Sequence, residues 1–371
     1  MRLEGHAENS RDTNINDRSF SNREAGIIIQ TVVAVWKANS PAVVWMCSPL
    51  WVAPIILGLD GAAPEWGPIV VFALTVTSIV AMAEFANSYS DREEDKIYFP
   101  SNPLVTAELE PGAAKRALAA QNVLTGLLLL ALLLVTFDYQ LIIAVAAGWF
   151  VGMSYSVQPF RFKETAAAPV FYAIGVALLP IAAWLLVAPL NDFIIAFTSF
   201  FALHSYGYGI TYKFRKTFHA LNAGIIQIGS DGSVFNLPSV GLGLKVRTAM
   251  ALEAITSLGS FILVPIFWHT GAFDAPLSIS LLTLPFVLTA LTISLRVRNP
   301  VGNGPKCIVT MTLAWMFIIL SFFAVALTDV LQWHWGYAVL ACIAFPVGSV
   351  ILLKAVHPFE YKALSSPWEE I

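Results

Sequence analysis

Charged residues are scarce in this chain. Asp, Glu, Lys and Arg make up 12% of its 371 residues, whereas hydrophobic residues make up 57%. This composition excludes a pair of ordinary soluble domains as the expected architecture. The chain also lacks a linker rich in Pro, Gly or Ser, so we expect a single domain over residues 25–371. Residues 1–24 are polar and lack the apolar stretch of a signal peptide, so we expect a disordered tail there.

Cysteine is almost absent as well. The three cysteines, Cys47, Cys307 and Cys342, lie within or beside apolar stretches and do not have metal-ligand spacing. The pattern argues against a cysteine metal site. We expect the three side chains to pack as small hydrophobic groups.

Long apolar runs are what the chain has in excess. Each run is roughly 17–25 residues long, which is enough to cross a bilayer as a helix. The sequence therefore predicts an all-α membrane bundle of about ten helices. The expected spans are residues 41–59, 67–87, 117–136, 140–156, 168–188, 193–212, 248–268, 276–295, 307–328 and 332–353.

Positive charge is missing from every second loop of that bundle. If residue 1 is cytoplasmic, all 21 Lys and Arg residues lie in cytoplasmic segments or at cytoplasmic helix ends, and the outside loops carry acids alone. This positive-inside bias predicts an integral, multi-pass membrane protein with both termini in the cytoplasm. The two long loops, 88–116 and 213–247, then predict a central cavity open to the cytoplasmic side. The sequence does not indicate which membrane holds the protein.

The second span ends in a row of polar side chains. Asn87, Asp91 and Asp95 are spaced four residues apart, and Glu84 precedes them by three residues. On a helix this spacing places all four on one face. Carboxylates at the end of a membrane helix are costly and typically mark a substrate or ion site. Their oxygens suit Mg²⁺, which takes one or two carboxylates together with waters and substrate phosphates.

This row resembles the first motif of the UbiA-type intramembrane prenyltransferases, N-D-x-x-D-x-x-x-D. Asn87, Asp91 and Asp95 match the motif's Asn and its last two Asp positions, while Ser88 replaces its first Asp. The resemblance implies a UbiA-like fold and Mg²⁺ as the cofactor, with Asn87, Asp91 and Asp95 as its ligands.

Two further segments carry the resemblance. The family's loop R-P-L-P-S-G-R-L is matched in part by Asn102 (for Arg), Pro103, Leu104, Thr106 and Ala107 (for Gly). The segment from Tyr155 to Lys163 is similar to the Y-S-x-P-x-R-x-K segment of the branch that includes chlorophyll and homogentisate prenyltransferases. Within it, Arg161 and Lys163 are cations suited to phosphate oxygens, although ordinary positive-inside anchoring would also explain them.

The family's second acidic motif, D-x-x-x-D, has no counterpart. Residues 236–243 resemble the stretch that follows it, but no paired aspartates precede them, and Asp231 is the only acid in loop 213–247. The sixth span instead ends in a basic and phenolic face made of His204, Tyr208, Tyr212 and Lys216, with Lys213 adjacent. This face could hold diphosphate directly, Asp231 could reach back as a lone ligand, or the residues are only interfacial anchors. Glu253, near the end of the seventh span, is expected to snorkel to the interface.

Together these features predict a Mg²⁺-dependent enzyme that ionises an isoprenyl diphosphate and transfers the prenyl group to a small-molecule acceptor in the bilayer. The alternative on the same scaffold is a UbiA-type terpene cyclase, in which the cation of farnesyl or geranylgeranyl diphosphate is attacked by its own double bonds. A transporter would place its ionisable groups at mid-membrane, which fits less well. A catalytically inactive relative of these enzymes is a further alternative. Nothing in the sequence indicates a nucleic-acid ligand or an obligate protein partner.

The expected site is therefore extensive. The residues expected to act in catalysis are Asp91, Asp95, Tyr155 and Lys163. Those expected to bind the substrate are Asn102, Arg161, His204, Tyr208, Tyr212, Lys213, Lys216 and Asp231.

Overall fold

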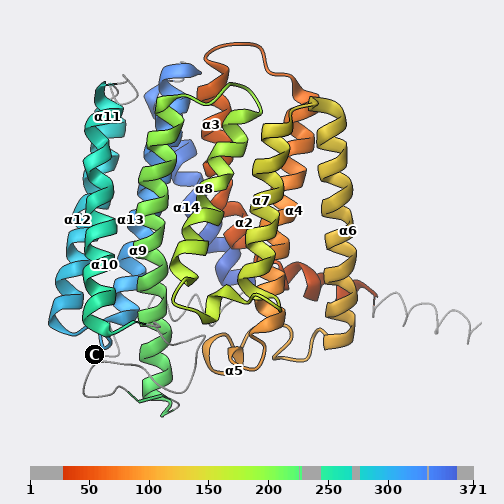
Figure 1. Ribbon diagram of the computed structural model, residues 1–371, viewed down its shortest axis with the longest axis vertical. Coiled ribbons are helices and arrows are strands. Elements are labelled where there is room, and N and C mark those ends of the chain that lie inside the picture. The colour runs from red at the N-terminus through yellow and green to blue at the C-terminus, as the bar shows by residue number, and fades with distance from the viewer. Residues whose placement is uncertain (1–27, 225, 228–243, 270–275, 332–333, 357–371) are drawn as a thin grey trace, which may run out of the picture.

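The computed structural model describes residues 28–371 apart from 225, 228–243, 270–275, 332–333 and 357–371. Within this part, long helices run side by side in one bundle (Figure 1). The expected tail over residues 1–24 lies outside the described residues, as do Asp231 and residues 236–243. The single domain over residues 25–371 stays a prediction.

Twelve helices form the bundle in the described residues. They are α2 (Pro41–Cys47), α3 (Pro49–Leu59), α4 (Trp66–Ser90), α6 (Pro111–Thr136), α7 (Tyr139–Ser156), α8 (Ala168–Leu185), α9 (Asp192–Asn222), α10 (Val246–Gly259), α11 (Val264–His269), α12 (Pro276–Arg298), α13 (Gly304–Val325) and α14 (Trp335–Val356). Nine stretches of the described residues are long and apolar enough to cross a membrane, and they overlap nine of the expected spans. The remaining expected span, 276–295, is α12, which packs against α10 and α13.

Three of the spans depart from the expected pattern; the seventh, 248–268, is divided into α10 and α11 by a 3₁₀ turn, Ser260–Leu263. The first is divided into α2 and α3, because Pro49 cannot supply a backbone N–H to continue the helix and instead begins α3. The sixth, α9, runs to Asn222, ten residues beyond the expected end, so its basic residues belong to a helix and not to a loop. No Gly or Pro interrupts this extension until Gly224, whose φ of 69° is typical of a helix C-terminus.

Side-chain size differs between the two sides of the bundle. Around α9 and α13, a core rich in aromatic rings is closely packed, with Phe197 and Phe322 ring centroids 4.0 Å apart. The core between α4, α7 and α8 consists mainly of Ala, Val, Leu and Ile. Smaller side chains leave more room between these helices, and the cavity described below lies there.

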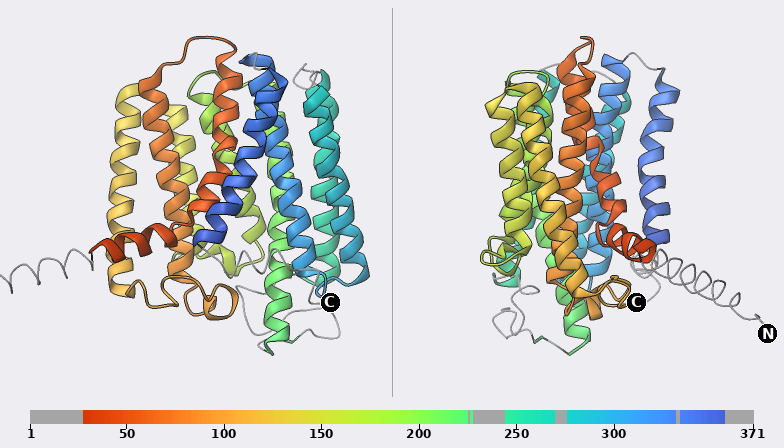
Figure 2. Two further views of the ribbon diagram at one scale, coloured as in Figure 1. Left: turned by 180° about the vertical axis from the view of Figure 1, so that it is seen from behind. Right: turned by 90° about the vertical axis from the view of Figure 1, so that its right-hand side faces the viewer.

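A short helix, Ile28–Ala38, lies across the end of the bundle where α2 begins (Figure 2). Ile28, Ile29 and Val32 are exposed on it, whereas Ala34 and Ala38 are buried. An apolar exposed face on a helix in this position is typical of one that lies in the membrane interface.

Glu253 does not snorkel to the interface, so that expectation is wrong. Its side chain is 1% exposed and forms an ion pair with Arg296 on α12, with Nε and Oε2 3.3 Å apart. The Thr211 hydroxyl also donates to its carboxylate. Arg296 in turn lies over the Phe214 ring and donates to the Pro300 carbonyl at 2.6 Å. An internal partner at this depth replaces the water that snorkelling would have reached.

Candidate active site

The polar row at the end of α4 keeps helical geometry beyond the helix itself. The Asp91 amide donates to the Asn87 carbonyl at 2.9 Å, and the Asp95 amide donates to the Asp91 carbonyl at 2.7 Å. At about 100° per residue, Glu84 and Asp95 differ by only about 20° around this axis. The row therefore presents one face, and Glu84, Asn87 and Asp95 line a cavity inside the bundle.

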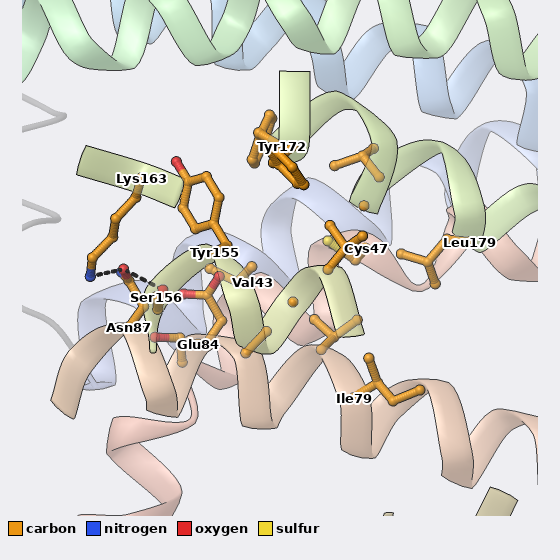
Figure 3. Close-up of a pocket in the computed structure, with 18 of the residues that line it drawn as sticks. Val43, Cys47, Ile79, Glu84, Asn87, Tyr155, Ser156, Lys163, Tyr172 and Leu179 are labelled. Carbon is orange, nitrogen blue, oxygen red and sulfur yellow. Dashed lines mark hydrogen bonds between the residues drawn. The ribbon is translucent and has the colours of Figure 1, made fainter. Parts of the chain in front are cut away.

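Lys163 is placed by the loop that follows α7. Arg161 adopts a left-handed backbone with φ 40°, and the chain then forms a short 3₁₀ turn, Phe162–Glu164, beneath the cavity. The Lys163 Nζ donates to Asn87 Oδ1 at 3.0 Å and to Ser90 Oγ at 2.6 Å, and it lies 2.5 Å from Asp91 Oδ1. Lys163 thus bridges Asn87 and Asp91. Figure 3 shows its hydrogen bond to Asn87.

The end of α9 brings further cations to the same place. Lys216 Nζ lies 3.4 Å from Asp91 Oδ2, and Lys213 Nζ donates to the Lys163 carbonyl at 2.5 Å. Arg161 Nη2 approaches Asp91 Oδ1 at 3.5 Å from the other side. Asp91, which is 1% exposed, therefore faces three basic side chains. Such a buried charge is tolerated because it is paired.

The two aspartates differ in charge state. Burial disfavours the charged form of Asp91, but Lys216, Lys163 and Arg161 outweigh it and hold the pKa of Asp91 at about 2. Burial, together with the neighbouring Asp91 charge, raises the pKa of Asp95 to about 7. Asn102 Nδ2 donates to Asp95 Oδ2 at 2.7 Å. Asp91 is thus a permanent anion, whereas Asp95 changes charge near neutral pH.

The cavity has a volume of about 430 Å³ and two unlike ends. Its charged end is lined by the basic side chains Lys163, Lys213, Arg215 and Lys216 and by the acidic Glu84 and Asp95. From there it extends between α4, α7 and α8 to Val76, Ala144 and Ala182. Val76 is eight residues from Glu84 along α4, or about 12 Å. Figure 3 shows this arrangement, with Lys163 at one side and Ile79 and Leu179 at the other. The cavity fits an anionic head joined to an apolar chain.

Most of the expected site residues meet at this cavity. Asn102, Tyr155, Tyr208 and Tyr212 line it, together with the cations named above. Arg161 and Asp91 are not among the lining residues. Asp91 pairs with Lys163 and Lys216 from behind, and Arg161 pairs with Asp91.

His204 lies elsewhere. It is fully buried against Phe261, with ring centroids 6.2 Å apart, and does not line the cavity. The cause is that a four-residue step is longer than one helical turn of 3.6 residues. Four-residue steps advance by about 40° each, so His204 is turned by about 120° from Lys216 around α9. Asp231 lies outside the described residues.

Several lining positions were not anticipated. Gly148 and Gly152 on α7 line the cavity one turn apart, with Ala144 one turn further up. A four-residue repeat of small side chains in a span is the sequence signal that could have revealed them. Cys47 also lines the cavity, whereas Cys307 and Cys342 are buried as expected. Trp315 and Leu353 close the cavity from α13 and α14, and the sequence carries no signal for them.

Fold and site together define a class, a multi-pass membrane protein whose helices enclose an amphipathic cavity with one charged end. The model of the UbiA prenyltransferase family matches residues 46–303, and the chain belongs to that family. A search of curated protein sequences found no match.

Solved structures agree with the fold. One, from a study of digeranylgeranylglyceryl phosphate synthase in membranes, aligns with a TM-score of 0.56 at 13% identity, covering 80% of this chain and 99% of that one. A UbiA homologue from Archaeoglobus fulgidus bound to DMAPP and Mg²⁺ aligns with a TM-score of 0.51 at 18% identity, covering 79% and 98%. At these identities the likeness establishes the UbiA-like all-α bundle.

Proposed function

We propose that this protein is a Mg²⁺-dependent enzyme that ionises an isoprenyl diphosphate and transfers the prenyl group to an acceptor. The observation that carries the proposal is the amphipathic cavity, with four basic and two acidic side chains at one end and an apolar extension from it. An isoprenyl diphosphate has the same division into a charged head and an apolar chain. Membership of the UbiA family and the DMAPP and Mg²⁺ bound to the A. fulgidus homologue support the assignment.

The donor set fits a magnesium ion. Asn87 Oδ1 and Asp91 Oδ1 converge on one cation, the Lys163 ammonium, at 3.0 and 2.5 Å. These are hard oxygen donors, and Asp95 adds a second carboxylate one turn further on. When bound, Mg²⁺ would neutralise charge that develops on the leaving diphosphate. Asn87, Asp91 and Asp95 would hold it, and Lys163 would then be released toward the phosphate oxygens.

The remaining residues have separate tasks in the proposal. Lys163, Lys213 and Lys216 bind phosphate oxygens and favour departure of the diphosphate. Asn102 orients Asp95 through its 2.7 Å hydrogen bond. Tyr155 presents its phenol beside the charged end of the cavity. Further in, the rings of Tyr172 and Tyr208 stack with centroids 5.8 Å apart, and their faces can stabilise an allylic cation.

A terpene cyclase is the second candidate, favoured by this same aromatic pair within an apolar cavity. In that reaction the cation would be attacked by double bonds of its own chain. Both reactions share ionisation at the charged end, so they differ only in the fate of the cation.

The test uses the purified full-length protein in lipid nanodiscs with farnesyl or geranylgeranyl diphosphate. We expect release of diphosphate that requires Mg²⁺ and stops on chelation with EDTA. Mass spectrometry of the organic products then separates the candidates. Product that forms only with an added aromatic acceptor supports transfer, whereas a cyclic hydrocarbon from the diphosphate alone supports cyclisation. Failure to release diphosphate from either substrate would refute both.

The orientation in the membrane remains part of the proposal. Lys163, Arg215 and Lys216 gather at the end of the bundle where α4 and α9 finish, and by the positive-inside rule this supports a cytoplasmic location for that end. The substrate head would then enter from the cytoplasmic side.

A further inference from the structure

Glu84 is a carboxylate in the cavity to which the proposed reaction has so far given no task. It lies on α4, one turn before Asn87 and about 4.5 Å further into the bundle. Its side chain is half-buried and lines the cavity, where it forms the part of the charged end that faces Ile79 on the same helix (Figure 3).

The partners of Glu84 differ from those of Asp91. The Ser40 side chain lines the cavity together with Glu84. Within the part of the chain that the structure describes, no Lys or Arg comes within ion-pair distance of the Glu84 carboxylate, whereas three cations face Asp91. A carboxylate that forms no ion pair is costly inside a membrane protein and usually has a functional reason.

The position of Glu84 coincides with the place where charge would develop. If the diphosphate binds among Lys163, Lys213 and Lys216, the first carbons of the prenyl chain lie at the boundary between the charged and apolar linings. Glu84 lies at that boundary. The described cavity lining holds only one other carboxylate, Asp95, which is held by Asn102 on the diphosphate side.

We propose that Glu84 is the base that accepts the proton released when the allylic cation is quenched, an inference that rests on the proposed function. The carbon–oxygen bond breaks, and its electron pair leaves with the diphosphate. In transfer, the acceptor supplies the electron pair of the new bond to the prenyl carbon and gives its proton to a Glu84 carboxylate oxygen. Without an acceptor, a C–H bond next to the cationic carbon supplies the pair for a new double bond, and its proton goes to the same oxygen.

The test compares Glu84→Gln with the unaltered protein, using geranylgeranyl diphosphate and Mg²⁺, once with an aromatic acceptor and once without. Gln has nearly the same shape but cannot accept the proton. Two products of the same turnover are measured, namely diphosphate by a coupled assay and organic products by mass spectrometry. Glu93→Gln, an identical change at an exposed residue of the same end, is the matched control.

We expect Glu84→Gln to release diphosphate within about tenfold of the unaltered rate, because ionisation does not use this residue. Hydrocarbon formation should fall by at least about 10²-fold, which is typical for loss of a general base. Water should then capture the cation, so that prenyl alcohol becomes the main product. Glu84→Asp should restore part of the hydrocarbon.

Three results would overturn the inference. An unchanged hydrocarbon fraction in Glu84→Gln would mean that the proton goes elsewhere, for example to the departing diphosphate. A parallel fall in diphosphate and hydrocarbon would assign Glu84 to binding or folding. Prenyl alcohol as the only product of the unaltered protein, with and without the acceptor, would show that no base acts on the cation. Absence of diphosphate release by the unaltered protein under both conditions would instead refute the proposed function, and the inference with it.

Discussion

Two clusters of oppositely charged side chains are buried in the described part of the protein, and their surroundings differ. Asp91 pairs with Lys163, Lys216 and Arg161 beside an open cavity. Glu253 pairs with Arg296 between α10 and α12, where both side chains are 1% exposed. Neither residue of this second pair lines the cavity.

The second cluster is closed, since Arg296 also covers Phe214 and bonds to the Pro300 carbonyl. The first is open, because Lys163 and Lys216 line the cavity, where the proposed function has them bind a phosphate. A buried ion pair alone does not identify a functional site. Contact with a cavity that could hold a ligand separates the two clusters, and mutations should separate them as well.

The largest effect should come from Asp91→Asn. The substitution keeps the shape but leaves three cations without their shared anion and removes a proposed metal ligand. We expect Mg²⁺-dependent diphosphate release to fall by about 10³-fold. Glu93→Gln, which alters an exposed carboxylate, should leave the rate within about twofold. Activity within tenfold of the unaltered protein in Asp91→Asn would show that the two clusters do not differ in function.

Removal of a cation from the open cluster should have the next largest effect. Lys216→Met keeps the apolar stem but loses the ammonium that faces Asp91 and the cavity. A charge-assisted hydrogen bond contributes about 1.5–3 kcal/mol, so we expect roughly a 10–100-fold lower rate of diphosphate release. Lys96→Met, at an exposed position of the same end, is the control. Equal rates for both variants would remove Lys216 from the site.

Because of Asp95, the Mg²⁺ concentration that gives half-maximal diphosphate release should depend on pH. Its pKa is raised to about 7 by burial and by Asp91, and a carboxyl group must lose its proton to bind a metal. Below pH 7 the proton competes with the ion, so the Mg²⁺ concentration for half-maximal diphosphate release should rise roughly tenfold per pH unit. In Asp95→Asn this dependence should vanish. A half-maximal concentration that stays constant from pH 8 to pH 6 in the unaltered protein would contradict the prediction.

A larger side chain at Gly148 should shorten the apolar part of the cavity and leave its charged end unchanged. A Cβ atom there would meet Leu178 Cβ at an ordinary 3.9 Å, so the side chain of Gly148→Val can extend into the apolar part. We expect kcat/KM for geranylgeranyl diphosphate to fall about tenfold relative to geranyl diphosphate. Gly259→Val, at a helix position with open space around it and away from the cavity, is the control. A loss that is equal for both substrates would indicate misfolding and not a shorter cavity.

The sequence predicted the features that follow from regular residue spacing along one helix. Long apolar runs fix the spans, and the spacing of Asn87, Asp91 and Asp95 fixes the face that they share. A contact between distant elements has no such signal. That Lys163 would bridge Asn87 and Asp91 depends on the fold of the loop after α7, and that Lys216 would face Asp91 depends on how far α9 extends.

His204 and Glu253 show the corresponding errors. A four-residue repeat looks like a continuous face over two turns, but after three steps the accumulated rotation takes His204 away from the cavity. Glu253 looks like an interfacial residue because its partner Arg296 is 43 residues away in sequence. For His204 the deciding quantity is the accumulated helical rotation, which the residue spacing already contains. For Glu253 it is the packing between helices, which a single sequence does not display.

The smallest effect on activity should come from the closed cluster. Glu253→Gln leaves the Arg296 guanidinium buried without its counter-ion, and breaking such a pair typically costs about 3–5 kcal/mol of folding free energy. We therefore expect a lower melting temperature in detergent, while diphosphate release per folded molecule stays within about twofold. The double variant Glu253→Gln, Arg296→Met should melt at a higher temperature than Glu253→Gln alone, because no charge is left uncompensated. A loss of turnover in Glu253→Gln comparable to that in Asp91→Asn, at equal folding, would mean that this pair also takes part in the reaction.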